Sequence, residues 1–319
     1  MADYLTSWLL ALVQTALFVA SAPLLAGWIK RVKCRLQNRR SPPVIQPYRD
    51  LVRLFRKEML LAEESSWLFR AAPYVIFGAT VLAAAVVPLV AVRLPTSAIA
   101  DVIVLVGFFA LARFFLALAG MDVGTAFGGM GSSREMTIAS LAEPALLMAV
   151  FTVAMGAHTT DLSVVIERIL SHGLMIRPSF VFAALGLMLV AVAETGRIPV
   201  DNPATHLELT MIHEATVLEY SGRHLALIDW ASQIKLMIYA VLIANIFLPW
   251  GVAVQFSAGA LLLGAMAVSL KLAVLATVLA VSETLFAKMR LFAVPQFLGF
   301  AYLLCLLGML SHVILEVGG

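Results

Sequence analysis

The stretch FVFAALGLMLVAVAETGRIPVD, residues 180–201, is apolar as far as Ala193 and then turns to charged residues and a proline. An α-helix needs roughly 20 apolar residues to cross the hydrocarbon core of a bilayer. Comparable apolar runs recur at about 5–29, 74–92, 98–119, 137–157, 178–195, 225–250, 258–282 and 294–316. We therefore expect an all-α polytopic membrane protein with about eight transmembrane helices, forming a single membrane domain over residues 1–319.

The composition agrees with this expectation. Of the 319 residues, 62% are hydrophobic and only 13% are charged, which lies far outside the range of soluble domains. The two cysteines, Cys34 and Cys305, are too few and too distant for an iron–sulfur cluster, a nickel site or a structural zinc. We therefore expect this chain to bind no metal, and any electron chemistry to occur on another chain.

The distribution of positive charge predicts the orientation in the membrane. Sixteen of the 22 Lys and Arg residues fall in the loops at about 30–73, 120–136, 196–224 and 283–293, and three fall in the opposite loops. The positive-inside rule places the first set in the cytoplasm and the N-terminus outside. Ala20-Ser21-Ala22 looks like a signal-peptidase site, but the leader before it has Asp3 and no Lys or Arg, so we expect a retained span. The net charge of +3 thus reflects topology, and no nucleic-acid partner is expected.

Several charged residues lie inside the expected spans or at their ends. A charge at mid-membrane costs about 2.5–3.5 kcal/mol on insertion scales, so such residues usually face a cavity or a partner. For Asp101 and Arg113, a structural ion pair is an equally good interpretation. For Glu143 we favour a functional role. Pro144 follows it and frees a backbone carbonyl that can hold water beside the carboxyl group. The full set is Asp101, Arg113, Glu143, Lys235 and Lys271, with Glu194 and Glu283 at span ends.

The segment RRSPPVIQPYRDLVRLFRKE, residues 39–58, has a different character. Prolines up to Pro47 prevent a continuous helix, and beyond them apolar and basic residues alternate at helical spacing. The apolar set is Leu51, Leu54, Phe55 and Leu61, opposite Arg49, Arg53, Arg56 and Lys57. This pattern predicts an amphipathic helix along the cytoplasmic surface. Anchoring to lipid headgroups explains most of it, and docking of a soluble partner is the sharper interpretation; both stay open.

The glycine-rich segment MDVGTAFGGMGSSREMT, residues 121–137, joins the third and fourth expected spans. It lacks the terminal Lys-Ser/Thr of a phosphate-binding loop, and no strand precedes it. We expect Ser132 and Ser133 to cap a helix ahead of Glu135. The glycines predict close backbone packing against another helix or subunit.

The acidic loop at residues 193–222 is the most polar part of the chain. Pro199 and Pro203 end the fifth span, and a helix could restart near Ala204. If it ran unbroken to Glu219, Glu208 and Glu219 would share one face, and His206 and His213 would share another. HEATV lacks the second histidine of the H-E-x-x-H zinc motif, so a metal site is not predicted.

Two interpretations of this loop remain. One is a solvated acidic segment. The other is a carboxylate-lined cytoplasmic cavity, in which neighbouring like charges raise some pKa values toward neutrality so that protons are held and passed on. Apolar residues interleaved with the acids favour burial, namely Leu207, Leu209, Met211, Ile212, Val217 and Leu218.

These motifs resemble a known family. The arginine-rich first loop ends in Q-P-Y-x-D-L-x-x-L-x-x-K-E (Gln46 to Glu58). The acidic loop contains E-x-x-R-x-P-x-D (Glu194, Arg197, Pro199, Asp201) and then E-Y-S-G (Glu219 to Gly222). Together and in this order, over nearly the whole chain, they are similar to the membrane subunit shared by respiratory complex I, as its subunit 1, and energy-converting nickel-iron hydrogenases of the formate hydrogenlyase and hydrogenase-4 component C type.

The resemblance implies a subunit at the junction of a membrane arm and a peripheral redox arm in a bacterial or archaeal cytoplasmic (inner) membrane. It implies a proton pathway through Glu143, Glu194, Asp201, Glu208, Glu214, Glu219, Glu283 and Lys235. Partner docking would involve Arg39, Arg40, Gln46, Tyr48, Asp50, Arg53, Lys57, Arg134, Arg197 and Arg290; Lys288 would join Glu283 and Arg290 in the last cytoplasmic loop.

The implied partners are hydrogenase-like large and small subunits and an iron–sulfur subunit on the cytoplasmic face, antiporter-like membrane subunits at the side, and membrane lipids. A nickel-iron centre and iron–sulfur clusters are expected on those partners and no cofactor on this chain. The forms DNPATHLELTMIHE, FGGMGSSRE and AKMRLFAVPQFLG resemble the hydrogenase-type branch. Ser41 departs from the family, whose members commonly have glycine in R-x-G-P, and this puts the conformation of that turn in doubt.

The expected function is therefore a non-catalytic membrane-anchor and proton-coupling subunit, linking redox chemistry in the peripheral arm to ion translocation. The alternative is the quinone-chamber subunit of NADH-quinone oxidoreductase, in which a quinone enters between the surface helix and the acidic cavity. A third interpretation is a stand-alone secondary transporter, and the absence of a recognisable inverted repeat argues against it.

Overall fold

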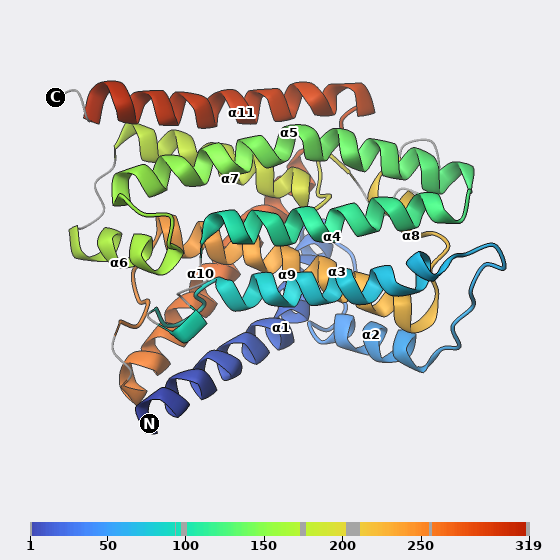
Figure 1. Cartoon of the computed structure of the whole chain (residues 1–319), viewed down its shortest axis with the longest axis horizontal. Helices are drawn as coiled ribbons and strands as arrows, with labels where there is room; N and C mark the ends of the chain where they lie inside the picture. The colour runs from blue at the N-terminus through green and yellow to red at the C-terminus, as the bar shows by residue number, and fades with distance from the viewer. Residues whose placement is uncertain are drawn as a thin grey trace.

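A computed structural model describes residues 2–92, 94–96, 101–172, 177–201, 211–254 and 257–316 of the chain, and these form a bundle of long α-helices (Figure 1). Within these ranges there are isolated β-bridges but no β-strand. The helices are α1 (Ala2–Leu36), α2 (Gln46–Arg56), α3 (Trp67–Val86), α4 (Val102–Asp122), α5 (Ala126–Ala157), α6 (Leu162–His172), α7 (Pro178–Glu194), α8 (His213–Val217), α9 (Gly222–Phe247), α10 (Ala258–Leu285) and α11 (Val294–Ser311). A 3-10 turn, η3 (Leu291–Ala293), precedes α11, and a π-helical turn, η4 (His312–Glu316), follows it.

The helices include enough apolar spans to confirm a polytopic all-α membrane protein. Among the described residues, seven helical segments are long and apolar enough to cross a membrane, and α7 is a shorter apolar helix of 17 residues. The helix α7 coincides with the run expected at 178–195, so the expected number of about eight spans is approximate. The helix α7 packs against α5 and α11.

The helix α9 forms the axis of the bundle. In the apolar window of α9, 61% of residues are buried, against 28% in α10 and in α11. The helices α3, α1 and α10 pack around α9, whereas α7 joins it to the α5 and α11 layer. The N-terminus, the C-terminus and α6 lie at one end of the bundle (Figure 1). The helix α2 and the turn between α4 and α5 lie at the other end, which we call the α2 end.

The helix α2 has the amphipathic division predicted from the sequence. It starts at Gln46, with Pro47 in the first turn, where a missing backbone N–H costs nothing. Leu51 is buried, whereas Arg53 is exposed. The helix packs on α9 and α1, and the ring of Phe55 meets that of Trp230 edge-on at 6.5 Å. The surface helix is therefore seated on the bundle rather than free.

The start of α5 corrects one expectation. The helix begins at Ala126 rather than near residue 137, so most of the expected 120–136 loop is helical. Thr125 is the cap, since its hydroxyl accepts a hydrogen bond from the amide of Gly128 at 3.3 Å. Ser132 and Ser133 lie inside the helix and are not caps; Ser132 is buried and donates to the Ala117 carbonyl at 2.9 Å. Polarity alone had suggested a loop, but tertiary packing extends the helix.

The glycines of this segment explain how α5 approaches its neighbours. A Cβ atom on Gly128 would lie 2.0 Å from the carbonyl oxygen of Gly120 on α4, and one on Gly131 would lie 2.9 Å from Ala215 on α8. Both distances are shorter than real contacts allow, so these positions require glycine. The expected close backbone packing is thus confirmed at 128 and 131, whereas no atom of the described residues would lie within 4 Å of a Cβ at 124 or 129.

The acidic loop corrects a second expectation. A helix does not run unbroken to Glu219, because Met211 and Ile212 are not helical and α8 covers only His213–Val217. Asp201 explains where α8 begins, since its carboxylate accepts hydrogen bonds from the amides of Ile212 and His213 at 3.3 Å each. Glu208 and His206 lie outside the described residues.

Candidate functional site

Four charged side chains from four helices form an alternating chain in the interior. Arg113 on α4 donates one guanidinium N–H to Glu143 Oε1 on α5 and another to Glu194 Oε2 at the end of α7. The Nζ atom of Lys235 on α9 lies 2.8 Å from Glu194 Oε2. We call Glu143, Arg113, Glu194 and Lys235 the ion-pair chain. It brings together three residues that the sequence placed on a proton pathway.

The middle of the ion-pair chain is more deeply buried than its ends. Side-chain exposure is 5% for Arg113 and 2% for Glu194, but 31% for Glu143 and 19% for Lys235. Charges are tolerated in such surroundings only when they are paired and hydrogen-bonded. The alternation of signs supplies this pairing without leaving a net charge, and it leaves the two ends accessible to exchange with their surroundings.

The two residues for which the sequence left an ion pair open have different roles. Arg113 is in an ion pair, with two carboxylates at once. Asp101 instead caps α4, accepting from the amide of Ile103 at 2.8 Å and from the hydroxyl of Thr160 at 3.0 Å. A charged residue within an expected span can therefore form an ion pair or cap a helix, and only its neighbours in the structure show which role it has.

Lys271, on α10, makes a separate polar contact near the C-terminal end of α9. Its Nζ atom donates to Asn245 Oδ1 at 3.4 Å, and the Asn245 amide donates to the carbonyls of Pro88 and Leu89. These carbonyls follow the end of α3, where backbone acceptors lack helical partners. The contact thus ties α9 and α10 to the end of α3.

A cavity of about 210 Å³ lies beside the ion-pair chain. Arg113, Glu194 and Lys235 line it, together with further titratable groups from four elements: Glu135, Arg197, Asp201, His213, Glu214 and Asp229. Sequence reasoning missed Glu135 and Asp229 as cavity residues. Asp229 carried a usable signal, because it is a charged residue within the expected span at 225–250, as Lys235 is.

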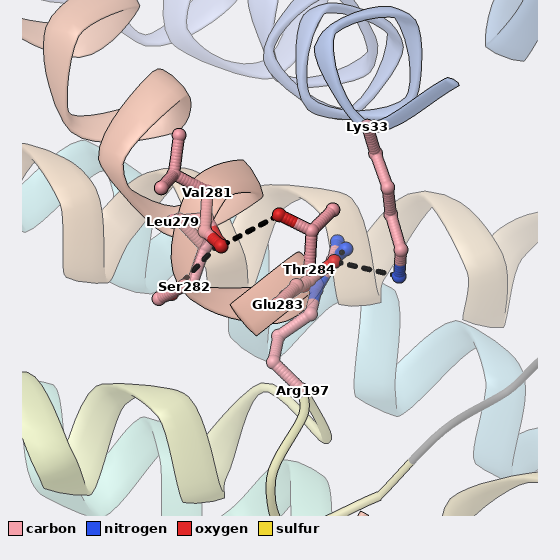
Figure 2. A network of polar contacts seen from close by, with 7 residues as sticks. All are labelled: Lys33, Arg197, Leu279, Val281, Ser282, Glu283 and Thr284. Carbon is pink, nitrogen blue, oxygen red and sulfur yellow. Dashed lines mark hydrogen bonds and ion pairs between the residues drawn. The ribbon is translucent and has the colours of Figure 1, made fainter. Parts of the chain in front are cut away.

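A second set of ion pairs joins the loops at the α2 end. Lys33 Nζ on α1 lies 2.9 Å from Glu283 Oε2 on α10, and Arg197 reaches Glu283 Oε1 at 3.3 Å (Figure 2). Lys288 Nζ lies 2.8 Å from Asp201 Oδ1. We call these five residues the loop clamp. The amide of Met289 also donates to the Pro199 carbonyl at 2.9 Å, so the loops after α7 and α10 are held together.

These contacts place a cation beside four of the acidic residues. Glu143, Glu194, Asp201 and Glu283 each lie beside a lysine or an arginine. Each of these four acids therefore has at least one ion-pair partner of opposite charge. The sequence could not show this, because the cations come from distant segments.

The remaining predicted pathway residues are divided between the cavity and the surface. Glu214 is partly buried in the cavity wall, whereas Glu219 is exposed in the turn after α8. The next residue, Tyr220, is buried, stacks on Phe69 at 4.0 Å and donates to the Phe69 carbonyl at 3.0 Å. Burial, with the charge of Asp122, raises the pKa of Tyr220 well above its ordinary value, so the phenol stays a donor. The E-Y-S-G motif thus anchors the start of α9.

The predicted docking residues include both exposed and internally bonded side chains. Exposed ones at the α2 end are Arg39, Arg40, Arg53, Lys57 and Arg290. On α2, Gln46 donates to Asp50 at 2.9 Å, and the partly buried Tyr48 donates to the Ala20 carbonyl. Arg134 donates to the Met211 carbonyl at 2.8 Å, and Arg197 is part of the loop clamp. Arg134 and Arg197 therefore bond within the chain, whatever further contacts they make.

Comparisons with known proteins agree with this architecture. A family model described as NADH dehydrogenase matches residues 8–314. Formate hydrogenlyase subunit 4 of Escherichia coli is 34% identical over 92% of this chain and 95% of its own length, and hydrogenase-4 component C of the same organism is 32% identical over 91% and 92%. An NADH-quinone oxidoreductase subunit of Syntrophotalea carbinolica is 26% identical over 78% and 80%.

A solved structure shows the same fold. In the membrane-bound sulfane sulfur reductase, an archaeal respiratory membrane complex, one chain matches 96% of this chain and 99% of its own length with a TM-score of 0.80. The sequence identity is 19%, so this likeness concerns the fold alone. The arrangement of the apolar helices is therefore shared even where most residues differ.

Proposed function

The chain belongs to the NADH dehydrogenase family, and we propose that it is the membrane-anchor and proton-coupling subunit of a hydrogenase-type complex. It would lie in the cytoplasmic membrane with its N-terminus outside and the α2 end in the cytoplasm. It would carry no catalytic centre of its own. Its role would be to connect a redox reaction in a peripheral arm with ion movement through the membrane arm.

The choice of branch is supported by the relatives. Two relatives above 30% identity, each matched over more than nine tenths of both chains, carry the names formate hydrogenlyase subunit 4 and hydrogenase-4 component C. The proposed partners are accordingly hydrogenase-like large and small subunits and an iron–sulfur subunit against the α2 end. Antiporter-like membrane subunits would lie at the side. A nickel-iron centre and iron–sulfur clusters would belong to the soluble partners.

The observation that carries the proposal is the sharing of partners within the ion-pair chain. Arg113 contacts two acids, and Glu194 contacts two cations. If Lys235 loses its charge or moves away, Arg113 becomes the sole cation on Glu194 and binds it more strongly. The contact between Arg113 and Glu143 would then weaken. A charge change beside the cavity would thereby reach Glu143 on α5.

The cavity and the loop clamp supply the entrance to this relay. Glu214 lines the cavity, and Asp201 belongs both to its wall and to the loop clamp. A redox change in the soluble arm above these loops would alter the charge beside Lys235. Glu283, which the sequence placed on the same pathway, would hold the entrance loops in position through its two cations.

A quinone-chamber subunit of NADH-quinone oxidoreductase is the second candidate, supported by the relatives that carry the name of that enzyme. The hydrogenase-type function ranks first because relatives above 30% identity carry the names of hydrogenase-type subunits. Protection of cavity residues from crosslinking by added quinone would reverse this order.

Glu143→Gln tests the proposal directly. In the assembled complex, in inverted membrane vesicles, this variant should retain its soluble subunits and its redox turnover but lose proton translocation. Glutamine keeps the size and the hydrogen bond to Arg113 but cannot exchange a proton. Glu63→Gln, at an exposed loop position, is the matched control and should translocate normally. Normal proton translocation in Glu143→Gln would refute the relay.

A further inference from the structure

The two oxygens of Glu194 have unequal surroundings. Arg113 and Lys235 both contact the same atom, Oε2. The other atom, Oε1, is fully buried and completes no hydrogen bond with any group in the described part of the chain. Buried polar atoms in native proteins nearly always have a partner, because an unmade hydrogen bond there costs free energy. Oε1 is therefore the position on Glu194 at which a proton can be bound.

Tyr239 presents a second buried polar atom without a completed hydrogen bond. It lies one helical turn after Lys235 on α9, so the two side chains share a face. The residue is 1% exposed, and its hydroxyl has no hydrogen-bond partner among the described groups. Lys235, which contacts Glu194, also lies against the Phe109 ring on which the Tyr239 ring stacks, and Phe109 and Glu194 line the same cavity. Two buried polar atoms without a completed hydrogen bond therefore lie in the same part of the interior.

Aromatic contacts hold the Tyr239 ring in place. The Phe109 ring on α4 stacks on it with a centroid distance of 5.3 Å and an interplanar angle of 17°. Lys235 Nζ lies 5.8 Å from the centroid of the same Phe109 ring. These contacts restrict the ring but leave the phenolic hydrogen free to rotate about its C–O bond. The hydroxyl can therefore reverse its hydrogen-bond direction without any change in packing.

The donor and acceptor properties of the neighbours show what this freedom permits. Arginine and lysine only donate hydrogen bonds. Arg113 and Lys235 can therefore donate to ionised Glu194 but cannot accept a hydrogen bond from its protonated form. A phenol both donates and accepts. Tyr239 can therefore donate to Oε1 when Glu194 is ionised and accept from Oε1–H when it is protonated.

We propose that Tyr239 is a positioning residue of the relay, which selects Oε1 of Glu194 as the proton-binding oxygen and satisfies it in both protonation states. This inference rests on the proposed function. The charged groups that face Glu194 and Tyr239 are Arg113 on α4, Glu143 on α5 and Lys235 on α9, and Glu135 on α5 adds to the field at Arg113. None of the bonds to Oε2 has to break for the proton to bind.

The test is Tyr239→Phe in the assembled complex, which removes the hydroxyl and keeps the ring stacked on Phe109. Proton translocation per redox turnover should fall roughly tenfold, as expected for the loss of one partner from a buried polar group. Isotope-edited infrared difference spectra should show the C=O band of protonated Glu194, identified by its loss in Glu194→Gln, at a shifted frequency. Tyr74→Phe, at an exposed position on α3, is the matched control and should leave both readouts unchanged.

A second variant keeps the proposal testable if Tyr239→Phe fails to assemble. Phe109→Leu leaves the hydroxyl but loosens the ring, so it should give a smaller loss of translocation and a broader carbonyl band. Wild-type translocation with an unshifted band in Tyr239→Phe would overturn the proposal, and so would an unchanged band in Phe109→Leu. If Glu143→Gln and Glu194→Gln also translocate normally, the proposed relay itself is wrong, so the two failures are distinguishable.

Discussion

The ion-pair chain and the loop clamp use the same residue types in opposite ways. In the ion-pair chain, acids and cations alternate, and each inner member has two partners of opposite sign. In the loop clamp, Glu283 is held by two cations from separate elements, and Asp201 by one cation and two backbone amides. The first arrangement permits exchange of partners, whereas the second opposes it.

The difference lies in how each network responds to a changed charge. In the proposed relay, a charge change at one end of the ion-pair chain makes the next member strengthen its other bond, so the change is passed along. When one cation leaves Glu283, the second still compensates the carboxylate, so the change stops there. Exposure points the same way, since Lys33 and Arg197 are 25% and 24% exposed and can be hydrated, whereas Arg113 is 5% exposed. A buried alternating chain suits a relay, and a part-hydrated clamp suits support.

The largest effect is expected at the centre of the ion-pair chain. Arg113→Met removes the cation shared by Glu143 and Glu194, so that Glu143 loses its ion-pair partner and the buried Glu194 keeps only Lys235. Breaking such a buried pair costs roughly 3–5 kcal/mol. The purified complex should lose this subunit or unfold at a much lower temperature in a thermal-shift measurement. The double variant Arg113→Met with Glu143→Gln restores charge balance and should recover part of the loss. Near-wild-type stability of the single variant would contradict the importance of this pairing.

An intermediate effect is expected in the loop clamp. Glu283→Gln leaves Lys33 and Arg197 without their carboxylate, but both can reach water, so we expect a loss of about 1–3 kcal/mol. Protease sensitivity of the loops after α7 and α10 should increase, while proton translocation per assembled complex is retained. The opposite result, full stability with no translocation, would move Glu283 from the loop clamp into the relay.

The smallest effect is expected on α2. Arg53 is 66% exposed and lies 3.8 Å from Asp50, and exposed pairs of this kind contribute about 0–1 kcal/mol. Arg53→Gln should therefore leave the thermal stability of the membrane subunit unchanged. If α2 docks the soluble arm, the variant should release that arm at a lower salt concentration than wild type. A stability loss comparable to that of Glu283→Gln would show that the Arg53–Asp50 ion pair helps to stabilise the fold.

The helices could be predicted from the sequence wherever the length of an apolar run is enough to identify a membrane span. The eight apolar runs and the division of α2 into two faces follow from composition and spacing. The start of α5 was predicted too late, because glycine and serine read as loop signals, whereas contact with Gly120 and α8 makes the same residues helical. The expected helix through the acidic loop also failed, because Asp201 captures the amides at which α8 begins.

The candidate site shows the same limit. Charges within apolar runs identified Glu143, Glu194 and Lys235 in advance, because burying a charge in a membrane is costly and needs a reason. The same criterion could not distinguish Arg113, which joins two acids, from Asp101, which caps a helix. It also gave no signal for Tyr239, since a tyrosine in an apolar helix is ordinary.

The sequence by itself determined that this chain is a bundle of membrane-crossing helices with sequestered acids, because apolar length and the cost of buried charge are local properties. Only the tertiary structure decided which cation stands beside which acid, which oxygen of Glu194 completes no hydrogen bond among the described residues, and which acids are held in the loop clamp. The reason is that ion pairing and hydrogen bonding depend on distance and direction between groups far apart in the chain.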